Sequence, residues 1–221
     1  MIGRESLRQG IVPAYIFLCI VLGGSGQGIW GNLVLQLLGI ALIGWAVLAA
    51  PARPTGVALR RLALIAIAAI ALVALQLVPL PPGLWTNLPG RNLIAQGYNS
   101  LGEPLPWLPL SLAPYRTLAS ALFLIPPIAV LVGVAKLQAC RRSWAVGAIL
   151  LATLLSVFLG YIQVSTRSPS WYLYDFSNFG SAVGFFANRD HMGTLLLVAI
   201  PFIAVVLANG RGRERGEALA I

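Results

Sequence analysis

Six long apolar stretches, separated by polar or proline- and glycine-rich segments, dominate the chain. A helix that crosses a membrane needs about 20 predominantly apolar residues. The pattern therefore predicts an all-α, polytopic membrane bundle of about six transmembrane helices, forming a single transmembrane domain over residues 1–221. The expected spans lie near residues 11–30, 33–50, 62–80, 118–135, 144–162 and 192–208.

The first apolar stretch occupies the place where a secretory signal would lie, because Arg4 and Arg8 precede a short apolar core. No clean A-x-A cleavage pattern follows it, and five further spans do. We therefore interpret it as a retained first helix that extends through the glycines toward Trp30.

Two segments between the expected spans are long, namely residues 81–117 and 163–190. The first is rich in Pro, Gly and Trp, which argues against another span, and a short interfacial helix is expected near residues 91–101. Long loops carry function more often than short ones. Function is therefore expected on the face of the membrane where these two loops lie.

Composition supports the membrane assignment. The chain is 58% hydrophobic and 10% charged, whereas soluble domains carry about 25% charged residues. Cys19 and Cys140 form no disulfide framework, and the single histidine and six acids offer little for a metal cluster. The net charge of +9 comes from arginines scattered at the ends of apolar segments, which excludes a nucleic-acid-binding face.

The basic residues also predict an orientation, because loops on the cytoplasmic side are enriched in Lys and Arg. With the N-terminus inside, four arginines fall on the outer side, namely Arg91, Arg116, Arg167 and Arg189. Eleven basic residues fall on the cytoplasmic side, namely Arg4, Arg8, Arg53, Arg60, Arg61, Lys136, Arg141, Arg142, Arg211, Arg213 and Arg215. Both termini are therefore expected in the cytoplasm.

The stretch GFFANRDHMGTLLLVAIPF, residues 184–202, places three ionisable groups at the edge of the last span. Asn188 or Asp190 is expected to cap the helix, since either side chain can accept its first free N–H groups. A helix start binds phosphate well, and a neighbouring arginine adds a bidentate clamp. Arg189 and His191 are thus candidates for an anion site; the alternative is that Arg189 reaches lipid headgroups and His191 simply lies at the interface.

Other polar positions carry weaker signals. Arg116 also precedes a span and is a second candidate cation, although a solvated or headgroup-bound arginine is the default there. Arg91 has no specific signal. Gln36 and Gln76 lie within spans and are each expected to make an interhelical hydrogen bond. The prolines at 126, 127 and 201 are expected to kink their helices.

The 184–202 stretch resembles the signature of the O-antigen ligase and polysaccharide polymerase superfamily of bacterial inner membranes, which reads roughly G-x-F-x-N-R-N-H-x-A. The matching residues are Gly184, Phe186, Asn188, Arg189 and His191, with Asp190 in place of the second Asn and Gly193 at the small-residue position. The stretches LQLVPLPPGLWTNLPGR and PWLPLSLAPYRTLASALFLIPP are similar to a second family segment. The resemblance covers roughly residues 62–208.

This resemblance implies a glycosyltransferase-like enzyme of polysaccharide or lipopolysaccharide biosynthesis that uses no metal or other cofactor. Its partners would be membrane lipid, a glycan on undecaprenyl diphosphate, and an acceptor such as lipid A-core or the next repeat unit. Arg189, Arg116, His191 and Asn188 would bind the diphosphate at the periplasmic face; no catalytic base is assigned.

Members of the superfamily continue with more spans and a large periplasmic loop, so the chain is expected to correspond to the N-terminal portion of that architecture. One alternative is a non-catalytic scaffold or truncated remnant of the same family. Another is a small transporter, which should place charged residues at mid-membrane. Only the two glutamines approach that pattern, and no internal repeat supports it.

Overall fold

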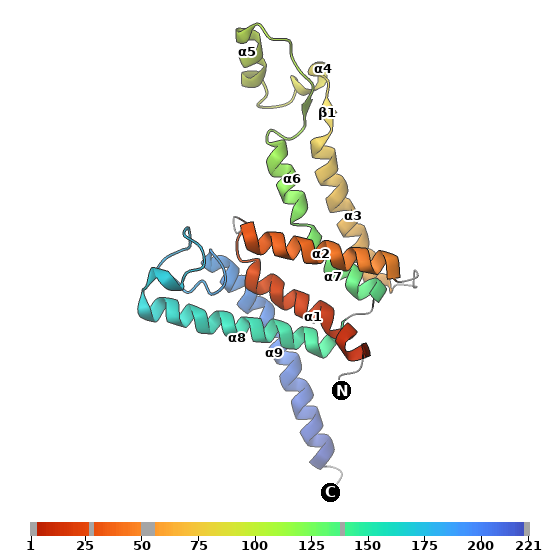
Figure 1. The fold of residues 1–221 in the computed structure, drawn as a ribbon, viewed down its shortest axis with the longest axis vertical. Coiled ribbons are helices and arrows are strands. Elements are labelled where there is room, and N and C mark those ends of the chain that lie inside the picture. The colour runs from red at the N-terminus through yellow and green to blue at the C-terminus, as the bar shows by residue number, and fades with distance from the viewer. Residues whose placement is uncertain (1–3, 27–28, 50–55, 138–139, 219–221) are drawn as a thin grey trace. The chain divides into compact units, whose positions relative to one another are not determined.

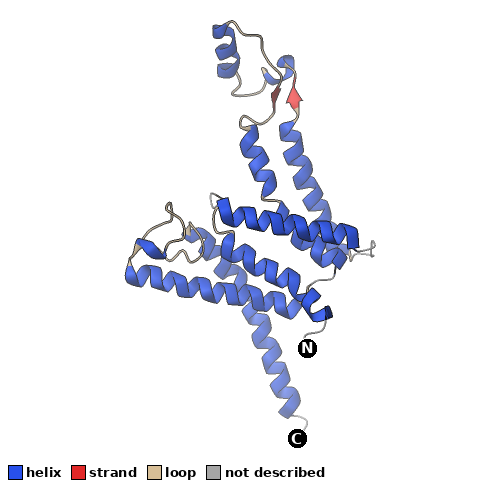
Figure 2. Cartoon of the chain, viewed as in Figure 1, coloured by secondary structure: helices blue, strands red, loops and turns tan. Residues whose placement is uncertain are grey.

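The computed structural model describes residues 4–26, 29–49, 56–137 and 140–218, and it is mostly helical (Figures 1 and 2). The helical class expected from the apolar pattern is therefore confirmed. Two compact units are present: Met1–Arg53 with Val132–Ile221 forms unit 1, and Pro54–Leu131 forms unit 2. Arg53, counted among the cytoplasmic cations, lies outside the described residues.

Five helices in the described part of the chain are long and apolar enough to cross a membrane. They comprise Ile29–Leu48, Val57–Leu77, Pro114–Leu137, Arg142–Thr166 and Arg189–Asn209. The apolar part of the first helix, Arg8–Leu22, is shorter than these. These helices are consistent with a membrane protein. Among the described residues five are long and apolar enough to span, where the sequence predicted about six spans.

Unit 1 is built from α1 (Arg4–Leu22), α2 (Ile29–Ala49), the π-helix η1 (Gly133–Leu137), α8 (Arg142–Thr166), the short 3-10 helix η2 (Pro169–Trp171) and α9 (Arg189–Ala218). α1 packs along α8, and small residues permit the approach (Figure 1). A Cβ on Gly10 would lie 2.9 Å from the Trp144 ring of α8. Where η1 meets α1, a Cβ on Gly133 would lie 2.7 Å from Val12.

The first helix ends earlier than expected. α1 stops at Leu22, residues 23–26 form a turn, and Trp30 belongs to α2, so the predicted extension of the first span to residue 30 is wrong. Gly23 and Gly24 approach other backbone so closely that neither position has room for a Cβ. The glycines therefore separate two helices, which is their usual effect in a sequence.

α1 and α8 run in the same direction. At their starts the Arg141 backbone N–H donates to the carbonyl of Gln9. At their far ends, Gly24 and Gln163 both bind the segment that leads into α9.

Unit 2 contains α3 (Val57–Leu77), β1 (Pro79–Leu80), α4 (Pro82–Trp85), α5 (Asn92–Leu101), β2 (Leu108–Pro109), α6 (Pro114–Leu122) and α7 (Ile125–Val132). α3 lies beside α6 (Figure 1), and β1 pairs antiparallel with β2, matching Pro79 with Pro109. The expected helix near 91–101 is confirmed as α5. Trp85 is fully buried, and its Nε1 donates to the carbonyl of Pro106 at 2.9 Å.

The double proline, expected to kink its helix, lies just after an interruption of the helical stretch. α6 ends at Leu122 and α7 starts at Ile125, so Pro126 and Pro127 occupy the second and third positions of the new helix. Proline is tolerated in a first turn, because the backbone N–H groups there have no partner within the helix.

Arg91 is the buried arginine of unit 2, with 4% of its surface exposed. Its guanidinium donates to the carbonyls of Pro109, at 2.9 Å, and Leu110. It therefore ties α5 to β2 and is not available to an anion outside. The sequence carried no signal for this role, because the two carbonyls lie far along the chain.

Replacing Arg91 with Met should loosen this tie, because the part-buried carbonyls of Pro109 and Leu110 lose a charged donor, and a hydrogen bond to a charged group contributes about 1.5–3 kcal/mol. We expect faster proteolysis and hydrogen exchange across residues 104–113 in detergent. Arg116→Met is the matched control, since Arg116 is exposed and its removal should leave both rates unchanged. Equal rates for wild type and Arg91→Met would contradict the assignment.

Candidate functional site

Two asparagines cap the start of α9. The Asn188 Oδ1 accepts the backbone N–H of Asp190 at 2.9 Å, and the Asn178 Oδ1 accepts that of Arg189 at 3.1 Å. Of the two predicted caps, Asn188 is therefore the one used, while Asp190 lies in the first turn, where a carboxylate is favourable. Because these N–H groups are already satisfied, an anion at this helix start would depend on side chains more than on bare backbone.

Gln163, near the end of α8, holds the segment that leads into α9. Its side chain is fully buried. The Oε1 accepts the backbone N–H groups of Val183, at 3.0 Å, and Gly184, at 2.9 Å. The Nε2 donates to the carbonyls of Gly184 and Trp171, both at 3.0 Å. One side chain thus satisfies four backbone groups and fixes the loop in place.

Glycine is the only residue type that fits at position 184. Its φ is +57°, and a Cβ would collide with the Ser156 Oγ and lie 2.7 Å from the Ser156 carbonyl. Ser156 is itself fully buried; its Oγ accepts the Phe185 N–H at 3.3 Å and donates to the Met192 Sδ at 3.2 Å. The glycine that opens the 184–202 stretch is therefore explained by close packing on α8.

The turn at residues 23–26, here called the glycine turn, presses against the same segment. The Gly24 carbonyl accepts the Ala187 N–H at 3.1 Å. Burial raises the pKa of the Tyr174 hydroxyl, and a hydrogen bond with the backbone of Gly24 offsets part of this rise. The hydroxyl therefore stays protonated at neutral pH. The glycine turn, Tyr174 and the start of α9 thus form one packed corner of unit 1.

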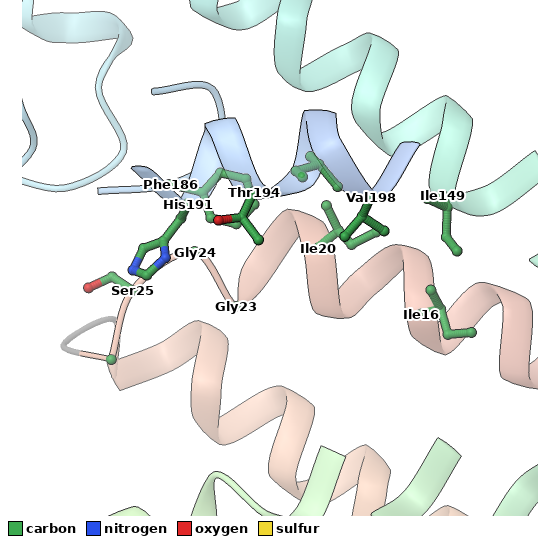
Figure 3. Close-up of a pocket in the computed structure, with 12 residues that line it drawn as sticks. Ile16, Ile20, Gly23, Gly24, Ser25, Ile149, Phe186, His191, Thr194 and Val198 are labelled. Carbon is green, nitrogen blue, oxygen red and sulfur yellow. The ribbon is translucent and has the colours of Figure 1, made fainter. Parts of the chain in front are cut away.

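Two adjoining hollows open at this corner. The first, about 430 Å³, is mostly apolar and runs between α1, α8 and α9 past Ile16, Ile20, Ile149 and Val198 (Figure 3). The second, about 360 Å³, is more polar and includes Phe176, Asn178 and Asn188. Both volumes lie in the range of small-molecule sites.

His191 and the glycine turn line both hollows. The imidazole extends from the first turn of α9 toward Ser25 on the glycine turn (Figure 3). The ring also lies 6.2 Å from that of Phe186, measured between centroids. His191 therefore lies where the apolar hollow and the polar hollow meet.

The predicted site residues are placed unequally. His191 lines both hollows and Asn188 lines the polar one. Arg189 is exposed at the start of α9, beside the hollows but outside their linings. Arg116 belongs to unit 2, where it is exposed and its Nε donates to the Tyr115 hydroxyl at 3.3 Å.

Sequence reasoning missed Gln163, Ser156, Asn178, Phe176 and the glycine turn. The GGSGQG run at residues 23–28 carried a usable turn signal that was interpreted as part of a span. Gln163, Ser156 and Asn178 have no local signal, because their hydrogen-bond partners lie in other segments of the chain. Phe176 is one of several aromatic residues in its loop, and nothing in the sequence distinguishes it from the others.

Comparison with models of protein families, with curated proteins and with solved structures gave no match for this chain.

Proposed function

We propose that this chain binds a glycan carried on undecaprenyl diphosphate at the periplasmic face of a bacterial inner membrane, as an O-antigen ligase or polysaccharide polymerase would. The observation that carries the proposal is the junction of an apolar and a polar hollow at His191, beside Arg189. A prenyl chain suits the first hollow, and a hydrophilic head suits the second. The motif resemblance supplies the identity of the carrier.

The orientation follows from the charge count, with both termini in the cytoplasm and the start of α9 outside. In this orientation the corner with the two hollows faces the periplasm, where a flipped lipid-linked glycan would be presented.

The proposed role of the cationic side chains is to stabilise the diphosphate as it leaves. In glycosyl transfer the acceptor oxygen bonds to the anomeric carbon while the bond from that carbon to the phosphate oxygen breaks, and the hydroxyl proton passes to the departing diphosphate or to water. Negative charge grows on the prenyl diphosphate as it leaves, and cationic donors placed there lower the barrier. Arg189 is the main candidate for this role, with His191 beside it. Arg116, which the resemblance implied as a second cation, belongs to unit 2 and has no part in the site proposed for unit 1.

A non-catalytic binding protein of the same family is the alternative. Among the described residues that line the two hollows, His191 is the only titratable side chain. The lining thus supplies groups for binding and little for general acid–base work. Transfer and simple binding are distinguished by activity on an acceptor, not by carrier binding.

Arg189→Ala is the test of the proposal. We expect the purified variant to lose about 10-fold or more in affinity for farnesyl diphosphate, since a charge-assisted contact to phosphate is lost. In cells the variant should fail to restore surface polysaccharide while still inserting into the membrane. Calorimetry or fluorescence titration in nanodiscs measures the first effect, and immunoblotting of polysaccharide measures the second.

Arg167→Ala is the matched control, because it removes an exposed arginine from the same loop without touching either hollow. Unchanged diphosphate affinity in Arg189→Ala, or equal losses in both variants, would remove the site. Labelling of a cysteine introduced at Ser170 with an impermeant reagent checks the orientation. Protection of that cysteine from outside would place the corner in the cytoplasm and end the proposal.

A further inference from the structure

The polar hollow contains groups that the proposed diphosphate contact does not use. Phe176, Asn178 and Ser25 line it together with backbone of the glycine turn. None of the three belongs to the NRDH stretch at the start of α9. We propose that this hollow is a saccharide subsite, which receives the sugar next to the diphosphate with Phe176 beneath its ring. This inference rests on the proposed function and makes it more specific.

Phe176 has the exposure and the setting of a stacking platform. Its side chain is 49% exposed although it sits at the edge of a hollow. Within the described residues its ring meets one other aromatic ring, that of Tyr174, at 5.8 Å between centroids. A flat apolar surface therefore remains open. The C–H face of a pyranose is flat and apolar in the same way, so the two surfaces can pack and exclude water.

The two asparagines offer donors whose orientation is already fixed. Each asparagine uses its Oδ1 to cap α9, so its Nδ2 group is not engaged by the cap. In the part of the chain that the structure describes, neither Nδ2 has a hydrogen-bond partner, and an amide NH₂ can donate twice. Sugar hydroxyls accept such bonds. Because the caps hold both side chains in place, little rotamer freedom is lost on binding.

The order of the two hollows matches the order of groups along the ligand. The apolar hollow meets the polar hollow at His191 and the glycine turn, which line both. A lipid-linked sugar runs from prenyl chain through diphosphate to saccharide in the same sequence. A free polypeptide or a phospholipid would not require an aromatic platform in the hollow beyond His191.

The test compares two probes on the full chain in nanodiscs. Farnesyl diphosphate reports the lipid and diphosphate contacts, and farnesyl diphospho-N-acetylglucosamine adds one sugar. Wild type should bind the sugar-bearing probe more tightly. Phe176→Ala should weaken that probe about 3- to 10-fold and leave farnesyl diphosphate within twofold. Phe176→Trp should keep the preference for the sugar.

Phe179→Ala is the matched control. It removes the same ring from the same loop at 54% exposure, and Phe179 lines neither hollow. Both probes should bind it as wild type does. Retained affinity for farnesyl diphosphate shows in each variant that the corner is folded.

The outcomes separate the two proposals. If wild type binds neither probe, the proposed function fails. If wild type binds farnesyl diphosphate and Phe176→Ala weakens both probes alike or neither of them, the carrier site stands and the saccharide subsite is overturned. An equal loss of sugar preference in Phe179→Ala also overturns it, since the effect would then belong to the loop as a whole.

Discussion

Gln163→Leu is expected to unfold the corner of unit 1 that holds both hollows. The substitution keeps a side chain of similar size but removes every polar atom from a fully buried position. Two backbone N–H groups and two carbonyls then lose their partner. Each buried group left unpaired costs about 1–3 kcal/mol, so the loss should reach several kcal/mol.

The consequence of Gln163→Leu should be visible at two levels. Thermal unfolding in detergent should begin at a markedly lower temperature, and hydrogen exchange should rise first at residues 171–187. Affinity for farnesyl diphosphate should fall with it, because the segment that Gln163 holds leads directly to Asn188 and His191. Hydrogen exchange that rises first at residues 171–187, together with a fall in farnesyl diphosphate affinity, distinguishes local opening of this segment from general aggregation.

Gln36→Leu provides the comparison. Gln36 lies in α2 and is half-buried, and within the described residues its side chain makes no hydrogen bond; the same is true of the Gln76 side chain. The expected interhelical bonds of these two glutamines are therefore absent from the described structure. Gln36→Leu should unfold like wild type. Similar unfolding temperatures for Gln163→Leu and Gln36→Leu would contradict the role given to Gln163.

Gly24→Ala is expected to separate the glycine turn from the start of α9. The added Cβ would overlap the Phe185 carbonyl oxygen, lie 2.8 Å from its carbon and lie 3.0 Å from the Phe186 Cα. All three are backbone atoms, so no side-chain rotation relieves the clash. Overpacking of this kind costs about 1–3 kcal/mol or more, and the hydrogen bond from Ala187 N–H to the Gly24 carbonyl should break.

The functional effect of Gly24→Ala should exceed its effect on stability, because Gly24 lines both hollows. We expect loss of measurable farnesyl diphosphate binding under conditions where the protein remains inserted and helical by circular dichroism. Titration at matched protein concentration measures it.

Gly193→Ala is the control for this change. Gly193 lies one turn into α9, and an added Cβ there meets nothing within 4 Å. Alanine favours helix over glycine by about 1 kcal/mol, so the variant should be as stable as wild type or slightly more so. If Gly24→Ala binds the diphosphate like Gly193→Ala, the close approach of the glycine turn has no part in the site.

The predictions that succeeded depend on neighbours in the chain. The apolar runs predicted the long helices, and the short helix α5 was predicted within a proline-rich loop. The double proline predicted a disturbance of the helix, which lies between α6 and α7. The cap of α9 was narrowed to Asn188 or Asp190 by residue type alone, and the structure selects Asn188. Such features follow from helix period and local hydrogen bonding, which a sequence displays directly.

The predictions that failed required knowledge of distant contacts. The glycines after α1 looked compatible with a longer first span, yet their close approach to residues 185–186 requires a turn. Arg91 carried no specific signal in the sequence, and the structure shows it buried against the carbonyls of Pro109 in β2 and of Leu110.

The sequence by itself determined that this is a helical, membrane-type chain, where most of its helices lie, and which cationic stretch precedes the last of them. Only the tertiary structure decided that Gln163, Ser156 and Gly24 converge on that stretch and that an apolar and a polar hollow meet at His191. The physical reason is that helix formation depends on residues a few positions apart, whereas a binding hollow is formed by segments more than a hundred residues apart, brought together by packing.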